Sequence, residues 1–369
     1  MSTPYRADQV GSLLRPKPLI DARLAFEAGQ TTPDDLHRLE DAAIRDVLAL
    51  QRDTGIHILS DGEFRRTTWG NGFVDKLTGL ADDVAGAVQG GRWQGSHADL
   101  ATTTLPGKKV VVDKVGASRP FTEDEVSFLK ANAGGPFKIT LPSPTMFLRL
   151  FVPGVSDRAY QDENELLEDF VAIYLKEIDW LLQAGVPYIQ LDSLRYISVI
   201  TDIQNRTGDA NQARRTLERL IDVDNRILSR ADRPGVTRGM HICRGNHRSA
   251  WMGEGSYEPV AEILFNLAQP DRFLLEYDDE RSGGFEPLRF VPKGKVVVLG
   301  LITSKTGQLE SLDLLRRRVD EATKYVPLEY LAISPQCGFA STHLGNLLSE
   351  DEEKRKLEFV VEAAEAIWG

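Results

Sequence analysis

The two cysteines of this 369-residue chain, Cys243 and Cys337, each follow a short apolar run. His241 lies two residues before Cys243, and alternate residues of a strand point to the same side, so this pair can bind one ion. Two thiolates and an imidazole are donors that Zn²⁺ prefers in a tetrahedral shell. A cysteine in an intracellular protein is more often a small buried hydrophobe, so the His-x-Cys spacing is weak by itself.

A fourth donor strengthens the prediction of a metal site. Glu276 ends the apolar run of residues 272–275, where burial of a carboxylate without a cation would cost free energy. The predicted zinc ligands are therefore His241, Cys243, Glu276 and Cys337.

The predicted ligand set favours catalysis over a purely structural role. Four-ligand zinc sites made only of protein groups usually serve structure. Here the ligands would come from three separate strands, and the oxygen ligand Glu276 could be replaced by a substrate thiol. A thiol bound to zinc loses its proton near neutral pH. We therefore expect a site that activates a thiol for attack.

Polar groups at other predicted strand ends could bind the rest of a substrate. Glu63 and Asp192 could hold an ammonium group, or could simply pair with nearby arginines. Val10, Gly11 and Ser12 end the first predicted strand. Their backbone N–H groups could hold a carboxylate, because glycine allows close approach.

The sequence does not assign a role to three further polar side chains. His247, in the loop after Cys243, could be a spare ligand, a proton donor or neither. His343 and Lys305 are equally open.

These residues must be positioned by eight short β-rich runs that alternate with amphipathic helices. The β-rich runs cover residues 7–13, 57–60, 137–141, 188–191, 239–243, 272–277, 295–301 and 330–334. The helices cover residues 33–54, 163–184, 210–229, 258–267, 309–324 and 351–367. This alternation predicts an α/β fold, a closed (β/α)8 TIM barrel over residues 1–369. Barrel active sites lie at the carboxyl ends of the strands, where the candidate residues fall.

A segment of about residues 80–115 breaks the alternation, because glycines and a proline separate β-prone pieces. We interpret it as a β-hairpin insertion after the second strand. It could cap the barrel mouth or make a subunit contact, so the sequence leaves a homo-oligomer open.

Charge and hydropathy narrow the class of partner. The chain has 44 Lys and Arg against 55 Asp and Glu, a net charge of −11. This balance argues against nucleic acid or an anionic membrane and favours a small-molecule substrate. The sequence has neither a signal-like N-terminus nor a membrane-length apolar run, so we expect a cytoplasmic protein. In a reducing compartment a cysteine pair favours metal binding over a disulfide.

The motifs also occur together in a known order. They are Val10-Gly11-Ser12, Asp61-Gly62-Glu63, Gln190-Leu191-Asp192, His241-x-Cys243, Glu276 and Pro335-Gln336-Cys337-Gly338. This set resembles the catalytic barrel of cobalamin-independent methionine synthase, and most of all its short, single-barrel relatives.

The resemblance implies a zinc-dependent methyltransferase in which a homocysteine thiolate displaces or distorts Glu276 and takes up a methyl group, giving methionine. It also implies that Glu63 and Asp192 hold the substrate ammonium and that the Ser12 backbone holds the carboxylate.

Three departures leave the methyl donor open between methyltetrahydrofolate and another carrier. The full synthase has a second barrel that helps to bind folate, and this chain has no room for one. Residues 301–305 replace the synthase's Asp-x-His pair, and Ser193-Leu194-Arg195 replaces its acidic-proline sequence.

Two rival functions use the same fold. An alkyltransferase like the epoxyalkane:coenzyme M transferases would act on a sulfonate thiol, and Arg65, Arg66 or Arg195 could bind its sulfonate. The retained Glu63 and Asp192 favour an amino-acid thiol instead. The other rival is a non-catalytic barrel with structural zinc.

Overall fold

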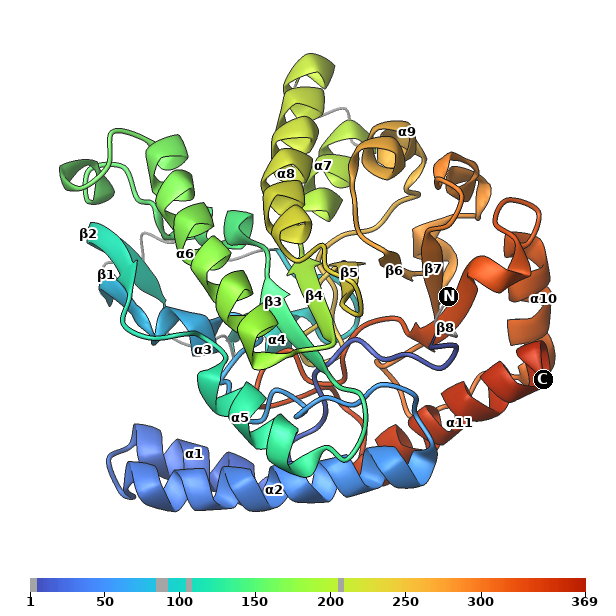
Figure 1. Cartoon of the computed structure of the whole chain (residues 1–369), viewed down its shortest axis with the longest axis horizontal. Coiled ribbons are helices and arrows are strands. Elements are labelled where there is room, and N and C mark those ends of the chain that lie inside the picture. Colours follow the sequence, from blue (N-terminus) through green and yellow to red (C-terminus); the bar gives the residue numbers. More distant parts are fainter. Residues whose placement is uncertain (1–4, 84–91, 104–107, 205–208) are drawn as a thin grey trace.

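Six parallel strands, hydrogen-bonded in chain order, form the centre of the molecule (Figure 1). The computed structural model describes residues 5–83, 92–103, 108–204 and 209–369. The strands are β3 (Lys138–Pro142), β4 (Tyr188–Ser193), β5 (Thr237–Ile242), β6 (Arg272–Glu276), β7 (Val296–Ile302) and β8 (Leu331–Pro335). Each lies within two residues of its predicted bounds. All residues of β3, β4, β6 and β8 are buried, as expected for parallel strands covered on both faces.

The first two predicted strands, 7–13 and 57–60, are not regular strands in the structure. Each makes a single parallel bridge, from Ala7 to Ile333 on β8 and from Leu59 to Phe137 beside β3. The His57 N–H also donates to the Ala7 carbonyl at 3.3 Å. Both segments soon leave the strand direction, because Gly11 within the first and Gly62 just after the second have positive φ angles. They therefore join the two edges of the sheet by isolated contacts.

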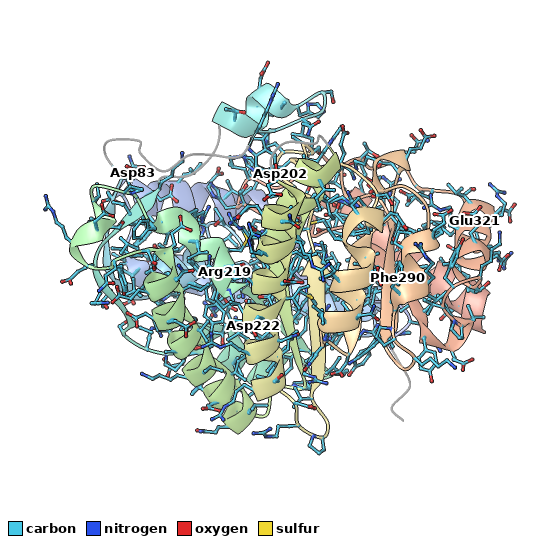
Figure 2. All side chains as sticks on the ribbon, turned by 90° about the horizontal axis from the view of Figure 1, so that it is seen from above. Asp83, Asp202, Arg219, Asp222, Phe290 and Glu321 are labelled. Atoms are coloured by element: carbon cyan, nitrogen blue, oxygen red, sulfur yellow. The ribbon has the colours of Figure 1, made fainter. Side chains whose placement is uncertain are left out.

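The long predicted helices are all present and surround the sheet (Figure 1). They are α2 (Pro33–Thr54), α6 (Glu163–Ala184), α8 (Ala210–Arg230), α9 (Glu258–Leu267), α10 (Leu312–Ala322) and α11 (Glu350–Trp368). Seen from above, α6 and α8 lie side by side (Figure 2). Asp162 caps the first turn of α6, and Gly185, with φ of 77°, ends it.

Shorter helices occupy segments for which no helix was predicted. They are α1 (Lys17–Glu27), α3 (Asn71–Val74), α4 (Ala98–Thr103), α5 (Glu123–Asn132), α7 (Arg195–Gln204) and the 3₁₀ helix η1 (Pro144–Leu150). Both η1 and α7 follow strands of the sheet, so they lie at the carboxyl edge where the candidate residues are.

An antiparallel pair of strands, β1 (Leu77–Asp82) and β2 (Lys109–Ala117), flanks the predicted insertion. Residues 84–91 and 104–107 of that insertion lie outside the described residues. Part of the remaining insertion pairs with the loop after β5, since the Gln94 N–H donates to the Trp251 carbonyl at 2.7 Å. Among the described residues, no helix has both the length and the apolar character needed to cross a bilayer.

Candidate metal centre

The structure brings the four predicted ligands together at the carboxyl edge of the sheet. His241 lies on β5, Cys243 directly after it, Glu276 at the end of β6 and Cys337 just after β8. One candidate ligand atom from each residue lies within 4.8 Å of the others. His241, Glu276 and Cys337 are buried, and Cys243 is partly exposed.

The geometry of the cluster fits zinc. The two sulfur atoms lie 3.6 Å apart. Zn–S bonds of about 2.3 Å in a tetrahedron would place two sulfurs about 3.8 Å apart. The Nδ1 atom of His241 lies 3.2 Å from the Leu274 carbonyl oxygen, which leaves Nε2 as the metal-binding atom. Both His241 Nε2 and Glu276 Oε2 are buried without a hydrogen-bond partner, as expected of ligand atoms.

Backbone contacts hold the ligands in place. The Arg244 N–H donates to Glu276 Oε1 at 2.6 Å, and the Gly245 N–H donates to Cys243 Sγ at 3.3 Å. Gly300 on β7 lets the loop that carries Cys337 approach closely, because a Cβ there would lie 2.7 Å from Gln336 Cα. The ligand positions therefore depend on backbone packing as well as on side chains.

Without a cation, the charges in this cluster conflict. Burial raises the pKa of Glu276 to about 7, and the nearby charge of Cys337 adds to that rise. Burial opposes protonation of His241, but its interaction with the nearby Cys337 thiolate raises its pKa to about 9. The Cys243–Cys337 hydrogen bond lowers the pKa of Cys337 and raises that of Cys243. A divalent cation would favour the deprotonated ligands.

The cluster opens into a cavity of about 360 Å³. The predicted site residues that line this cavity are Val10, Ser12, Glu63, Asp192, His241, Cys243, His247 and Cys337. Glu276 is not among the lining residues. A molecule in the cavity would therefore reach the two sulfurs and His241, while Glu276 lies behind them.

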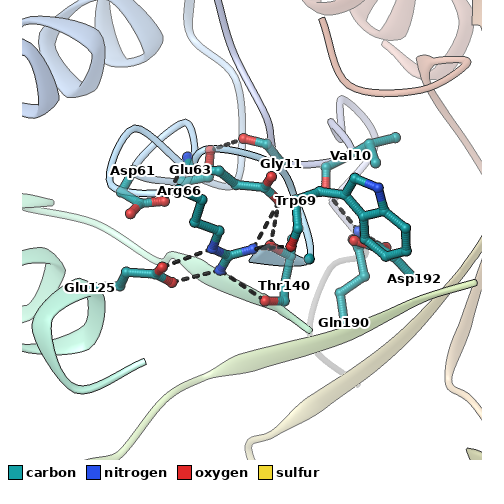
Figure 3. Close-up of polar contacts among 12 residues, drawn as sticks. Val10, Gly11, Asp61, Glu63, Arg66, Trp69, Glu125, Thr140, Gln190 and Asp192 are labelled. Carbon is teal, nitrogen blue, oxygen red and sulfur yellow. Dashed lines mark hydrogen bonds and ion pairs between the residues drawn. The ribbon is translucent and has the colours of Figure 1, made fainter. Parts of the chain in front are cut away.

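Glu63 has one oxygen held by the protein and one without a partner. Its Oε1 accepts a hydrogen bond from Thr140 at 2.7 Å and lies 3.2 Å from the Arg66 guanidinium (Figure 3). Its Oε2 is buried and has no hydrogen-bond partner. Burial raises the pKa of Glu63, although Arg66 opposes that rise. This carboxylate is therefore suited to bind a cationic group in the cavity.

Asp192 and the loop of residues 10–12 are joined by Gln190. The Gln190 amide donates to Asp192 Oδ1 at 2.8 Å and to the Val10 carbonyl at 2.7 Å (Figure 3). Burial raises the pKa of Asp192 to about 7. Gly11 has φ of 147°, and a Cβ there would lie 2.7 Å from the Thr140 side chain. Glycine is therefore required where this loop enters the cavity.

His247 lines the cavity, as one of its predicted roles would require. Its Nδ1 atom lies 3.0 Å from the Thr342 hydroxyl, and its ring packs against Trp93. Burial lowers its pKa to about 4. Lys305 and His343 do not line the described cavity, and Lys305 donates to Asn246 at 3.1 Å.

The arginines considered as sulfonate ligands behave differently from one another. Arg65 pairs with Glu40 and Asp41, and Arg66 pairs with Glu125 and Glu63. Arg195 lines the cavity.

Several cavity residues were not among the predicted site residues. Among them are Arg149, Trp93, Asn246 and Ser198. Of these four residues, only Asn246 had a sequence signal, because it belongs to the Gly245-Asn246 pair before His247.

Comparison with known proteins defines the family. Residues 7–214 match the family described as cobalamin-independent synthase, catalytic domain. The chain is also 40% identical to the Bacillus subtilis protein YxjG, whose function is uncharacterized, over 99% of this chain and 95% of YxjG. The chain therefore belongs to the cobalamin-independent methionine synthase family. Membership places it among the methionine synthase-like methyltransferases.

More distant relatives and solved structures agree with this assignment. A methionine synthase from Pyrococcus abyssi is 22% identical over 89% of this chain and 84% of its own length. A Listeria monocytogenes protein, provisionally assigned as a vitamin-B12-independent methionine synthase, is 32% identical with a TM-score of 0.73, covering 100% and 99% of the two chains. A B12-independent methionine synthase from Shewanella, in complex with selenomethionine, shares the fold at 22% identity and a TM-score of 0.71, covering 98% and 97%.

Proposed function

We propose that this protein is a zinc-dependent methyltransferase that moves a methyl group to the thiol of homocysteine and so makes methionine. The observation that carries this proposal is the shared cavity, because the metal-ligand cluster opens beside the carboxylates Glu63 and Asp192. A structural zinc site would be closed off from substrate. Here both cysteines and His241 line the cavity, which favours catalysis over the structural rival.

Zinc held by His241, Cys243, Glu276 and Cys337 would keep the substrate thiol deprotonated near neutral pH. Glu276 is the ligand that gives way to the thiol in this proposal. Its Oε1 already accepts from the Arg244 N–H, and the Arg281 guanidinium lies 4.0 Å from Oε2. The carboxylate therefore has partners in the protein when it moves back.

The acidic side chains would bind and orient the amino acid. Thr140 and Arg66 hold one oxygen of Glu63, so the unpartnered Oε2 can accept from the substrate ammonium. Asp192 would accept a hydrogen bond from a second ammonium N–H, and the Ser12 backbone would bind the substrate carboxylate. These contacts fix the thiol next to the metal ligands and raise its effective concentration there.

The methyl donor in this proposal is methyltetrahydrofolate or another methyl carrier. His247 is our candidate for the proton transfer to the leaving group, since it lines the same cavity. Because burial lowers its pKa to about 4, its imidazole is neutral at pH 7. The neutral imidazole would therefore have to receive a proton from another group before it donates one to the leaving group.

The proposal also includes the architecture around the site. We take residues 1–369 as one catalytic domain in which the six parallel strands and the two bridging segments form a closed (β/α)8 barrel. Residues 80–115 are then a hairpin insertion after the second strand position. We expect the enzyme to work in the cytoplasm on small molecules.

A methyl-transfer assay tests the proposed function. Zinc-loaded protein is mixed with homocysteine and either methyltetrahydrofolate or methylcobalamin, and methionine is measured. Mercaptoethanesulfonate, which has no ammonium group, serves as the alternative acceptor. We expect methionine from at least one donor and a preference for homocysteine. Absence of methionine with both donors, or a preference for the sulfonate thiol, would contradict the proposal.

A further inference from the structure

The cavity wall carries both acidic and basic groups. The metal-ligand cluster with Glu63 and Asp192 suits a metal and a cationic group. The same wall also carries the arginines Arg149 and Arg195 and the lysines Lys108 and Lys109. Because the chain as a whole is acidic, cations on a cavity wall need a specific explanation.

The two arginines come from adjoining segments. Arg149 lies in η1 after β3, and Arg195 begins α7 after the neighbouring strand β4. These segments touch, since the Leu194 N–H lies 3.4 Å from the Met146 sulfur. The two arginines therefore line the cavity from neighbouring segments.

Both guanidinium groups are without a partner among the described residues. In the described part of the chain, no carboxylate or hydrogen-bond acceptor contacts the side chain of Arg149 or Arg195. Other arginines at this edge of the sheet do pair, as Arg66 does with Glu125 at 2.6 Å and Arg281 with Asp278 at 2.8 Å. Arg149 is exposed and Arg195 is partly exposed, so both guanidinium groups are accessible to a ligand in the cavity.

The first turn of α7 adds to this positive character. Arg195 and Ser198 lie in that turn and both line the cavity. The first turn of a helix carries partial positive charge and free N–H groups that favour an anion. The helix end and the two unpaired guanidinium groups thus point to the same ligand chemistry.

We propose that Arg149 and Arg195 form an anion-binding subsite for the second, methyl-carrying substrate, and that this substrate carries a carboxylate or phosphate group. This inference rests on the proposed function. That function already assigns the ammonium and carboxylate of the amino-acid thiol to Glu63, Asp192 and Ser12. The planar guanidinium group suits bidentate binding of such oxyanions.

Direct titration with simple anions tests the subsite without turnover. Full-length, zinc-loaded protein is titrated with inorganic pyrophosphate and with glutarate, while the fluorescence of the cavity residues Trp69 and Trp93 is followed. The variants are Arg149→Gln, Arg195→Gln and the charge-retaining Arg195→Lys. Arg355→Gln, on the exposed face of α11, is the matched control.

We expect at least one anion to bind the unmodified protein, and the stronger probe tells whether phosphate or carboxylate is preferred. Each Gln variant should bind it about tenfold or more weakly, Arg195→Lys should bind it more tightly than Arg195→Gln, and Arg355→Gln should match the unmodified protein. If neither anion binds, or if both Gln variants bind as well as the control, the inference is wrong.

A second measurement separates this inference from the proposed function. In cobalt-substituted protein, homocysteine should change the metal absorption equally in the unmodified chain and in both Gln variants. Loss of that change only in the variants would mean that the arginines bind the thiol substrate, and would overturn the inference. No change even in the unmodified protein would contradict the proposed function, while the anion titration still decides the subsite.

Discussion

Two buried polar regions of this molecule share a location inside the sheet but differ in how their charges are satisfied. Around Lys138, the ammonium group contacts Asp8 at 2.7 Å and the Gln190 carbonyl at 2.9 Å, and Arg272 contacts Asp8 at 3.1 Å. In the metal centre, His241 Nε2 and Glu276 Oε2 have no hydrogen-bond partner among the described residues.

The difference separates a structural region from a functional one. The charged groups of the Lys138 cluster pair with one another within the protein, although Arg272 Nε has no hydrogen-bond partner among the described residues. The metal centre leaves donor atoms unpaired at equal burial, which is costly unless a cation binds. Gln190 links the two regions, because its carbonyl accepts from Lys138 while its amide donates to Asp192. The Lys138 cluster thereby orients Asp192, which we propose binds the substrate.

The largest effect should follow removal of one sulfur ligand. We expect Cys337→Ala to lose bound zinc and methyl-transfer activity, because three ligands cannot complete the protein's share of the shell. Metal content and methionine formation are the measurements. Ser334→Ala, a small buried change on β8, is the control and should keep both. Full zinc content in Cys337→Ala would show that Cys337 is not a zinc ligand.

The comparison predicts a loss of stability, and not of metal, when the Lys138 cluster is broken. Lys138→Met leaves Asp8 with only part of its compensation, and we expect the free energy of unfolding to fall by about 3–5 kcal/mol. Urea unfolding measures the change, with the exposed Lys130→Met as control. A loss below about 1 kcal/mol would show that the buried Lys138–Asp8 pair contributes no more to stability than a surface ion pair does.

A smaller effect is expected on substrate binding at Glu63. Glu63→Gln removes the negative charge that faces the substrate ammonium, while Thr140 can still donate to the side-chain oxygen. We expect KM for homocysteine to rise roughly 10- to 100-fold, the equivalent of one hydrogen bond to a charged group. Binding of mercaptoethanesulfonate, which lacks an ammonium, should be unchanged. Equal weakening of both thiols would exclude the proposed ammonium contact.

The last effect is a change of stability with pH, caused by a buried acid outside both regions. Glu353 on α11 accepts from the Leu14 N–H at 2.8 Å, and burial raises its pKa from 4.5 to about 8. A raised pKa means that its contribution to stability is fully present below pH 4.5 and is lost as the pH rises through about 8. The expected slope is about 1.4 kcal/mol per pH unit within that window.

Replacing this acid by its amide should remove the slope. Glu353→Gln keeps the acceptor for Leu14 but cannot ionise, so its stability relative to the unmodified protein should increase with pH across the window. Urea unfolding at several pH values measures this difference. Parallel stability curves for the two proteins would show that Glu353 ionises in the folded state as easily as in water.

The sequence predicted that the four candidate ligands would lie together, because each lies at or just after the end of a buried strand. An isolated polar residue such as Glu276 after such a strand has few structural uses, so its position carried information. Helices α2, α6 and α9 matched their predicted bounds because apolar spacing is a local signal, to which α2 and α6 add the side-chain caps Thr32 and Asp162.

Other features depend on contacts that are distant along the chain. The segments 7–13 and 57–60 have strand-like composition, yet only Ala7 and Leu59 find bridging partners, because the following glycines redirect the backbone. The unpaired state of Arg149 and Arg195 depends equally on tertiary structure. Pairing of a cation is set by which carboxylates the fold brings near, and that is not visible in local sequence.

The central claim is that a zinc ion at this cluster exchanges a protein ligand for the substrate sulfur. X-ray absorption of the zinc-loaded protein tests it most directly. We predict two sulfur neighbours in the free enzyme, from Cys243 and Cys337, and one additional sulfur with one fewer oxygen after homocysteine is added. A spectrum that still shows two sulfurs with saturating homocysteine, or a protein that binds no zinc, would contradict the account.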